Sequence, residues 1–114
     1  MRDKVLAIDF DGTLCTHNYP YIGEPNTELI EKLKKEKECG TKLILWTCRE
    51  GKQLAEAVHW CEEKGLYFDA INDNLYEHIL AFGGNSRKIC ADYYINDRCL
   101  KIKDYLKGVL YNEC

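Results

Sequence analysis

The sequence contains little proline and no long apolar run. Only two of its 114 residues are proline, and the chain shows no repeat or low-complexity stretch. Its first apolar run, residues 5–8, ends at Asp9, which makes it too short for the core of a secretory signal or for a membrane span. We therefore expect no leader and no membrane association, and a single domain over residues 1–114.

The sequence also lacks a strong charge of either sign. Lysine and arginine number 16 and aspartate and glutamate 19, which gives a formal net charge of −3. Because proteins that bind nucleic acids usually depend on a basic surface, charge gives no support to nucleic-acid binding, although a small basic patch is compatible with this total. Hydrophobic residues make up 46% and charged residues 31%, as is ordinary for a globular domain.

No CxxC pair occurs among the cysteines, and their number is odd. Free cysteine is among the most often buried residue types, and disulfides are rare in cytosolic proteins. We expect the cysteines to be reduced, mostly buried core residues of a cytoplasmic protein. They are Cys15, Cys39, Cys48, Cys61, Cys90, Cys99 and Cys114.

Short apolar strands alternate with amphipathic helices along the chain. This alternation predicts an α/β fold, a Rossmann-like three-layer arrangement with a central parallel sheet, whose ligands bind beyond the carboxyl ends of the strands. Residues 14–25 are expected to form a loop or small flap, and residues 72–87 permit a short helix. The expected strands are 4–8, 42–46, 67–71 and 93–95, and the expected helices are 27–39, 51–64 and 101–110.

The strongest chemical signal is the segment VLAIDFDGTL, residues 5–14. Asp9 and Asp11 follow a buried strand, and their side chains would point to the same side if the strand geometry continued. Two carboxylates this close repel each other unless a cation or a shared proton offsets them, and Mg²⁺ suits oxygen ligands and phosphate partners. The alternative is an Asx-type turn with no chemical role.

The segments DFDGTL, LILWTCR and DYYINDR, together with Lys88, resemble the four ordered motifs of the haloacid dehalogenase-like (HAD) phosphohydrolases. The resemblance covers residues 5–98, and its first motif is highly specific. It implies a small HAD-like hydrolase without a cap domain, because the sheet's own helices and strands use up the two usual insertion points, residues 14–46 and 48–87. An open site of this kind would accept a phosphate monoester on a small molecule or at the end of a macromolecule.

The resemblance implies a role for each matching residue. Asp9 would attack phosphorus and form an aspartyl-phosphate, and Asp11 would protonate the leaving oxygen and then deprotonate the hydrolytic water. Thr47 would hydrogen-bond the transferring phosphoryl group, and Lys88 would neutralise its developing negative charge. Asp9 and Asp97 would hold Mg²⁺, with the backbone carbonyl of Asp11 as a further ligand.

The charge balance of such a site supports the same set. Asp9, Asp97 and a phosphate dianion together carry about −4, and Mg²⁺ with Lys88 returns about +3. Asn96 departs from the adjacent aspartates of many relatives, so whether Asn96 or Asp97 contacts the metal stays open, and weaker Mg²⁺ affinity or slower turnover is expected. Asp92 is a poorer metal candidate because it begins a strand, away from the carboxyl edge.

Arginines and histidines near the motifs are further candidates. Arg49 follows the second motif and Arg98 follows the fourth, so either could meet a second charge on a substrate, or both could be surface residues. We group Arg49 with Thr47 and Lys88 as predicted substrate-binding residues. His17, in the expected flap, is the histidine best placed for substrate contact.

Two other functions are compatible with the same pattern. A phosphorylation-driven signalling receiver also combines a parallel sheet, an acidic cluster, a Thr or Ser, a Lys and Mg²⁺. Its phosphorylated aspartate follows the third strand, which would be Asp73 here. A non-catalytic binding module that kept the fold is the second alternative. The Asn96 departure keeps this alternative open, whereas the complete set of motif residues argues against it; these are Asp9, Asp11, Thr47, Lys88 and Asp97. Catalytic turnover separates both from a phosphohydrolase.

Overall fold

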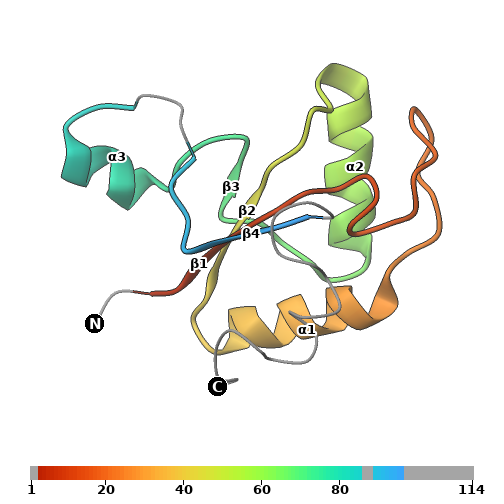
Figure 1. Ribbon diagram of the computed structural model, residues 1–114, viewed down its shortest axis with the longest axis horizontal. Coiled ribbons are helices and arrows are strands. Elements are labelled where there is room, and N and C mark those ends of the chain that lie inside the picture. Colours follow the sequence, from red (N-terminus) through yellow and green to blue (C-terminus); the bar gives the residue numbers. More distant parts are fainter. Residues whose placement is uncertain (1–2, 86–88, 97–114) are drawn as a thin grey trace.

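The computed structural model describes residues 3–85 and 89–96 of the chain. Its four strands form one parallel sheet in the order β3-β2-β1-β4 (Figure 1). This order matches the arrangement 3-2-1-4 of Rossmann folds, so the predicted α/β fold with a central parallel sheet is confirmed. The strands are β1 (Val5–Ile8), β2 (Lys42–Leu45), β3 (Ala70–Ile71) and β4 (Tyr93–Ile95), and the helices are α1 (Thr27–Glu38), α2 (Gly51–Glu63) and α3 (Tyr76–Phe82).

Side chains of the central strands alternate between two cores, one on each face of the sheet. Leu6 and Ile8 of β1 pack with the apolar faces of α1 and α2, whereas Val5 and Ala7 pack on the other face with Leu75, the residue before α3. Figure 1 shows α1 and α2 on one side of the sheet and α3 on the other. The connections from β1 to β2 and from β2 to β3 pass over one face of the sheet through α1 and α2, and the connection from β3 to β4 passes over the other face through α3. The strand order therefore reverses between β1 and β4.

Asn26 begins α1 and ties the helix to the loop that follows β1. Its side-chain oxygen accepts a hydrogen bond from the Leu29 backbone N–H at 3.2 Å, which identifies it as the N-cap. Its side-chain amide donates to the Thr13 carbonyl at 3.3 Å, and its backbone N–H donates to the Leu14 carbonyl at 2.8 Å. The start of α1 therefore supports the DFDGTL loop.

The third strand is shorter than predicted. The Asp69 carboxylate accepts the Leu43 backbone N–H at 2.8 Å, a donor that a longer β3 would have paired with a backbone carbonyl. Asp69 also forms an ion pair with Lys37 at 3.1 Å. In the segment 72–87, the helix that the sequence permitted is α3. The helix expected at 101–110 lies outside the described residues.

The cysteines differ from the prediction. Cys39 is disulfide-bonded, so the prediction that all cysteines are reduced is wrong. Cys15 and Cys61 are buried as expected, and burial raises the pKa of Cys61 to about 12. Cys48 and Cys90 are exposed. The cysteines thus no longer argue for a reducing compartment. Within the described part of the chain, no helix has the length and apolar character needed to cross a membrane.

We expect replacement of Asn26 by alanine to lower the free energy of unfolding by about 1–2 kcal/mol, because it removes the cap of α1. Urea denaturation measures the change. The neighbouring substitution Thr27→Ala should stay within about 0.5 kcal/mol, because its position makes no cap bond. Equal effects of the two substitutions would contradict the assignment of Asn26 as the cap.

Candidate functional site

Polar residues follow all four strands at the carboxyl edge of the sheet. The register pairs Ile8 with both Leu45 and Ile95, so the residues after β1, β2 and β4 begin at the same level. The Asp9 N–H donates to the Ile95 carbonyl at 3.0 Å, which places Asp9 beside the start of the segment after β4. The residues that follow the four strands are Asp9, Thr47, Asn72 and Asn96. Asp9 and Asn96 follow β1 and β4, between which the strand order reverses, and the crevice outside such a point is the usual ligand site of these sheets.

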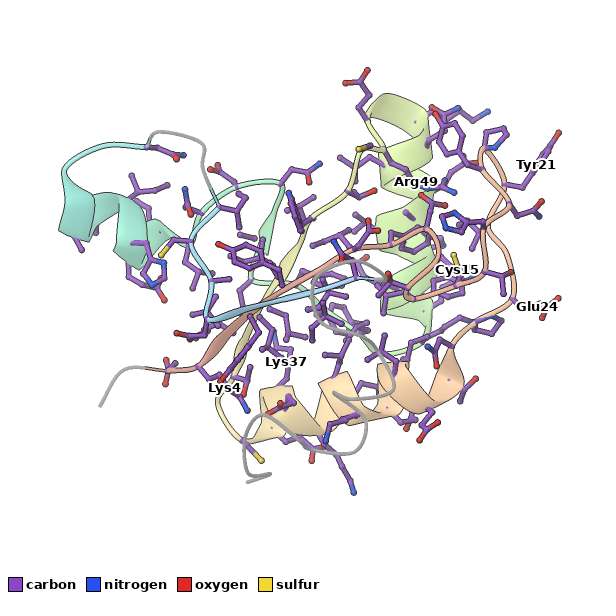
Figure 2. All side chains as sticks on the ribbon, viewed as in Figure 1. Lys4, Cys15, Tyr21, Glu24, Lys37 and Arg49 are labelled. Carbon is purple, nitrogen blue, oxygen red and sulfur yellow. The ribbon has the colours of Figure 1, made fainter. Side chains whose placement is uncertain are left out.

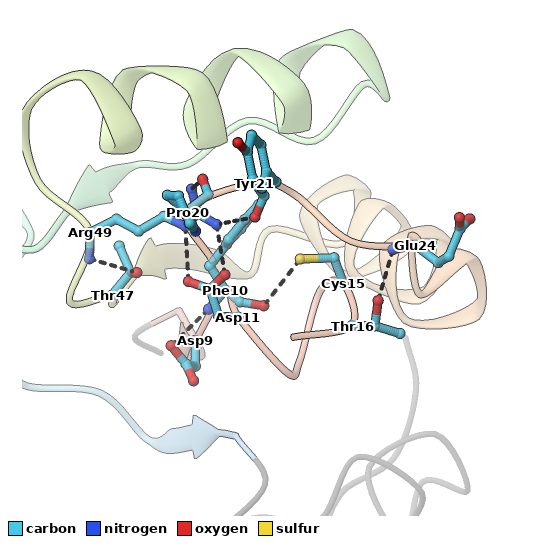
Figure 3. A network of polar contacts seen from close by, with 10 residues as sticks. All are labelled: Asp9, Phe10, Asp11, Cys15, Thr16, Pro20, Tyr21, Glu24, Thr47 and Arg49. Carbon is cyan, nitrogen blue, oxygen red and sulfur yellow. Dashed lines mark hydrogen bonds and ion pairs between the residues drawn. The ribbon is translucent and has the colours of Figure 1, made fainter. Parts of the chain in front are cut away.

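The two motif carboxylates do not point to the same side. Strand β1 ends at Ile8, so the extended geometry assumed for residues 9–11 does not continue. The Asp9 carboxylate accepts a hydrogen bond from the Phe10 N–H at 2.8 Å, and Figure 3 shows it on the side facing β4 (pale blue). The Asp11 carboxylate instead faces Arg49. Only Asp9 is thus directed toward the crevice.

A tight turn after Phe10 separates the directions of the two carboxylates. The Phe10 carbonyl accepts the N–H groups of Thr13 at 3.1 Å and Leu14 at 2.9 Å. Gly12 has a φ of +81°, a conformation that favours glycine, and a Cβ there would overlap the imidazole of His17. The turn therefore requires a glycine, and it carries His17 next to the motif.

The Asp11 carboxylate forms a bidentate ion pair with Arg49. Arg49 Nε donates to one Asp11 oxygen at 2.9 Å and Nη2 donates to the other at 2.7 Å. Arg49 is only 2% exposed, so the surface position considered for it is wrong. The substrate contact predicted for Arg49 stays a prediction, and the contacts of its guanidinium in this structure are within the protein.

Arg49 also holds the flap, residues 14–25. Its Nη1 donates to the Pro20 carbonyl at 3.2 Å and its Nη2 donates to the Tyr21 carbonyl at 2.8 Å. The guanidinium carbon lies 5.0 Å from the ring centroids of both Phe10 and Tyr19. The hydrogen bonds that Arg49 donates to the Asp11 carboxylate are the main cause that raises the pKa of Arg49. The flap tip and the motif loop therefore share one buried cation.

The flap forms a hairpin-like loop. The Thr16 N–H donates to the Glu24 carbonyl at 2.9 Å, and the Glu24 N–H donates to the Thr16 hydroxyl at 2.9 Å. Figure 2 shows Cys15, Tyr21 and Glu24 gathered near Arg49 and α2, away from Lys4 and Lys37 beside α1. The flap thus lies on the α2 side of the molecule.

Thr47 has the position predicted for it and an unpredicted partner. Its N–H donates to the Asn72 side-chain oxygen at 2.8 Å, and its hydroxyl oxygen accepts the Arg49 N–H at 3.1 Å. The second bond uses an oxygen lone pair and leaves the O–H donor for a phosphoryl oxygen. Sequence reasoning missed Asn72. Its position directly after a strand was the available signal, because asparagine tolerates the left-handed conformation it adopts, with a φ of 51°.

Lys88 and Asp97, the other predicted site residues, lie outside the described residues. Asn74, only 9% exposed, binds the chain on both sides of residues 86–88. Its amide donates to the Asn85 side-chain oxygen at 3.1 Å, and its oxygen accepts the Cys90 N–H at 2.6 Å. Asn74 therefore joins the loop after β3 to the segment that leads into β4.

The oxygen atoms that this edge of the sheet offers as metal ligands fit a hard cation such as Mg²⁺. Asp9 offers a carboxylate, Asn96 an amide oxygen and Asp11 a backbone carbonyl, and Mg²⁺ prefers oxygen ligands. The described residues contain no group of three His, Cys, Asp or Glu side chains suited to a metal, and Asp97 is not among them. Asp92 lies where it was expected, before β4 at the opposite edge of the sheet, and its carboxylate accepts the Val5 N–H at 2.7 Å.

Comparison with known proteins relates the chain to one solved structure. A conserved protein from Bacteroides thetaiotaomicron is 38% identical, and the match covers 95% of this chain and 90% of that chain with a TM-score of 0.80. Neither a protein-family model nor a curated protein sequence matches the chain. The name of the Bacteroides thetaiotaomicron protein states no activity or ligand, so the likeness establishes kinship and fold.

We expect Asp11→Asn to lower the free energy of unfolding by about 2–3 kcal/mol, because it leaves the buried Arg49 charge without its carboxylate. The value is below that for a fully buried pair, since the Asp11 side chain is 19% exposed and an amide oxygen can still accept one bond. Asp9→Asn makes the same chemical change in the same loop and should cost less than about 1 kcal/mol. Chemical denaturation measures both, and equal losses would contradict the role of the ion pair.

Proposed function

We propose that the chain, which belongs to the same family as the conserved protein from Bacteroides thetaiotaomicron, is a magnesium-dependent phosphohydrolase that acts through Asp9. The observation that carries the proposal is the position of Asp9 after β1, where the strand order reverses, beside Asn96 and with Thr47 after the neighbouring strand β2. The HAD-like motifs of the sequence supply the reaction class.

The reaction would proceed in two displacements at phosphorus. In the first, an Asp9 carboxylate oxygen bonds to phosphorus as the bond to the ester oxygen breaks, and Asp11 gives that oxygen a proton. In the second, Asp11 takes a proton from water as the water oxygen attacks phosphorus, and Asp9 leaves as a carboxylate. The products are the alcohol and inorganic phosphate. Thr47 would donate its hydroxyl proton to a phosphoryl oxygen, and Lys88 would offset the charge that develops there.

Asp11 is arranged for the second displacement. In the bidentate pair both carboxylate oxygens accept hydrogen bonds, as in a deprotonated carboxylate. The deprotonated carboxylate is the form that takes a proton from water. Each oxygen keeps a second lone pair, and the side chain is 19% exposed, so a water molecule can approach it. For the first displacement Asp11 has to carry a proton on one of these oxygens.

Asp9, the Asp11 carbonyl and Asn96 or Asp97 would hold the Mg²⁺ ion. When bound, the ion would offset the negative charge of the phosphoryl group and of the carboxylates. The expected substrate is a phosphate monoester on a small molecule or at a macromolecular end, because the helices and strands of residues 27–82 belong to the sheet and its covering layers.

The strand order argues against a signalling receiver. Receivers have the order 2-1-3-4-5, in which the strand that carries the phosphorylated aspartate lies next to β1. Here β2 separates β3 from β1, so Asp73 lies two strands away from Asp9. The Asp73 carboxylate also accepts bonds from the Asn74 N–H at 2.8 Å and the Asn85 amide at 2.6 Å. These contacts give Asp73 a role in the loop after β3.

Asp9→Asn should abolish Mg²⁺-dependent hydrolysis of an aryl phosphate, because an amide cannot form the covalent intermediate. Release of inorganic phosphate measures turnover, with and without EDTA. Asp73→Asn serves as the matched control and should keep at least about half of the wild-type rate, whereas a receiver would lose its phosphate with this substitution. Wild-type turnover that survives Asp9→Asn would refute the proposal.

Asn96→Asp should tighten Mg²⁺ binding, because it adds a negative charge beside Asp9. The Mg²⁺ concentration that gives half-maximal turnover should fall by about tenfold, equivalent to roughly 1.4 kcal/mol. Titration of activity with Mg²⁺ measures it. An unchanged half-maximal concentration would place Asn96 away from the metal and leave the metal contact to Asp97.

A further inference from the structure

The Arg49 guanidinium contacts two parts of the molecule that the proposed reaction uses in different ways. One is Asp11, the acid and base of both displacements, and the other is the flap tip at Pro20 and Tyr21. The ion pair and the Tyr21 contact share the Nη2 atom, which donates to Asp11 at 2.7 Å and to the Tyr21 carbonyl at 2.8 Å. A shift of the flap tip therefore disturbs the hydrogen bonds of Asp11.

The planar shape of the guanidinium is needed for this connection. Its five N–H donors lie in a rigid fork, and four of them are used in bonds to Asp11, Pro20 and Tyr21. Two aromatic rings, those of Phe10 and Tyr19, lie 5.0 Å from its carbon and limit its movement. A lysine ammonium is a point charge and cannot reproduce bonds in these separate directions.

We propose that Arg49 is a positioning residue that fastens the flap tip to Asp11, so that the flap and the acid–base group of the site hold their places together. The catalytic consequence of this coupling rests on the proposed phosphohydrolase function, but the coupling itself does not. Arg49 does not bind the substrate, because it is 2% exposed and most of its donors are occupied within the protein. It acts on the reaction through Asp11.

Amide hydrogen exchange tests the coupling without any need for activity. The probes are the backbone amides of Thr16, Tyr21 and Glu24, which are hydrogen-bonded within the flap. Arg49→Lys should raise their exchange rates by about tenfold or more, as expected when a local structure loses its anchor. Asp11→Asn should also raise them, because it weakens the hold on Arg49, the residue to which the Asp11 carboxylate is bonded.

The controls separate coupling from general loss of stability. Asp9→Asn carries the same chemical change two residues away and should leave flap exchange unchanged. Amides of β1 report global unfolding, so in each variant they should lose no more protection than the fall in the free energy of unfolding measured by denaturation accounts for. The double substitution Asp11→Asn with Arg49→Lys should be non-additive, because both remove the same connection. Flap exchange that ignores Arg49→Lys, or that responds equally to Asp9→Asn and Asp11→Asn, would overturn the proposal.

Steady-state kinetics with an aryl phosphate separate positioning from substrate binding. Arg49→Lys should lower kcat by about 10- to 100-fold and change KM by less than about threefold, because a misplaced Asp11 affects the reaction more than binding. Lys52→Met, at an exposed position of α2, is the control for loss of a nearby positive charge and should leave both constants unchanged. A raised KM with an unchanged kcat would assign Arg49 to the substrate and overturn the proposal.

The two arms distinguish failure of this inference from failure of the proposed function. Wild-type protein without Asp9-dependent turnover would refute the phosphohydrolase, and the exchange measurements would still decide whether Arg49 couples Asp11 to the flap. Asp9-dependent turnover together with an unaltered flap in Arg49→Lys would keep the phosphohydrolase and overturn the coupling.

Discussion

The ion pair between Arg49 and Asp11 is the interaction on which the candidate site depends. A buried guanidinium is costly to remove from water unless it is paired, and here the compensation comes from a carboxylate after β1 and two carbonyls of the flap. Three segments distant in sequence are joined because one cation needs all of them. The conformation of the motif loop therefore depends on the hydrogen bonds that Arg49 makes within the protein as much as on the sheet.

The sheet supplies the frame in which this pair can form. Strand β1 is central and fully buried, so the residues after it leave the core at a fixed level and in register with those after β2 and β4. Arg49 lies only a few residues beyond the end of β2, so its backbone is at the same carboxyl edge of the sheet as Asp11. A parallel sheet thus gathers polar groups at one edge, and the loops decide which of them face the crevice and which are bound within the protein.

Much of this frame could be predicted from the sequence, because it follows from local patterns. The apolar runs of β1, β2 and β4, and Asn26 before the periodic residues of α1, are visible within a few positions. The direction of Asp11 could not be predicted, since it depends on a turn that starts at Phe10, two residues after the end of β1, and on a cation 38 positions after Asp11. The disulfide of Cys39 was missed for a similar reason, as pairing depends on distances in space that spacing along the chain does not report.

The early end of β3 has a consequence for how the molecule meets its neighbours. An edge strand with a long row of free N–H and C=O groups is a template on which another chain can add a strand. Strand β3 extends for only two residues, between Asp69 and Asn72. The Asp69 side chain binds β2 and the Asn72 side chain binds Thr47. The same side chains that shape the loop after β3 thereby leave little of that edge for unwanted strand addition and aggregation.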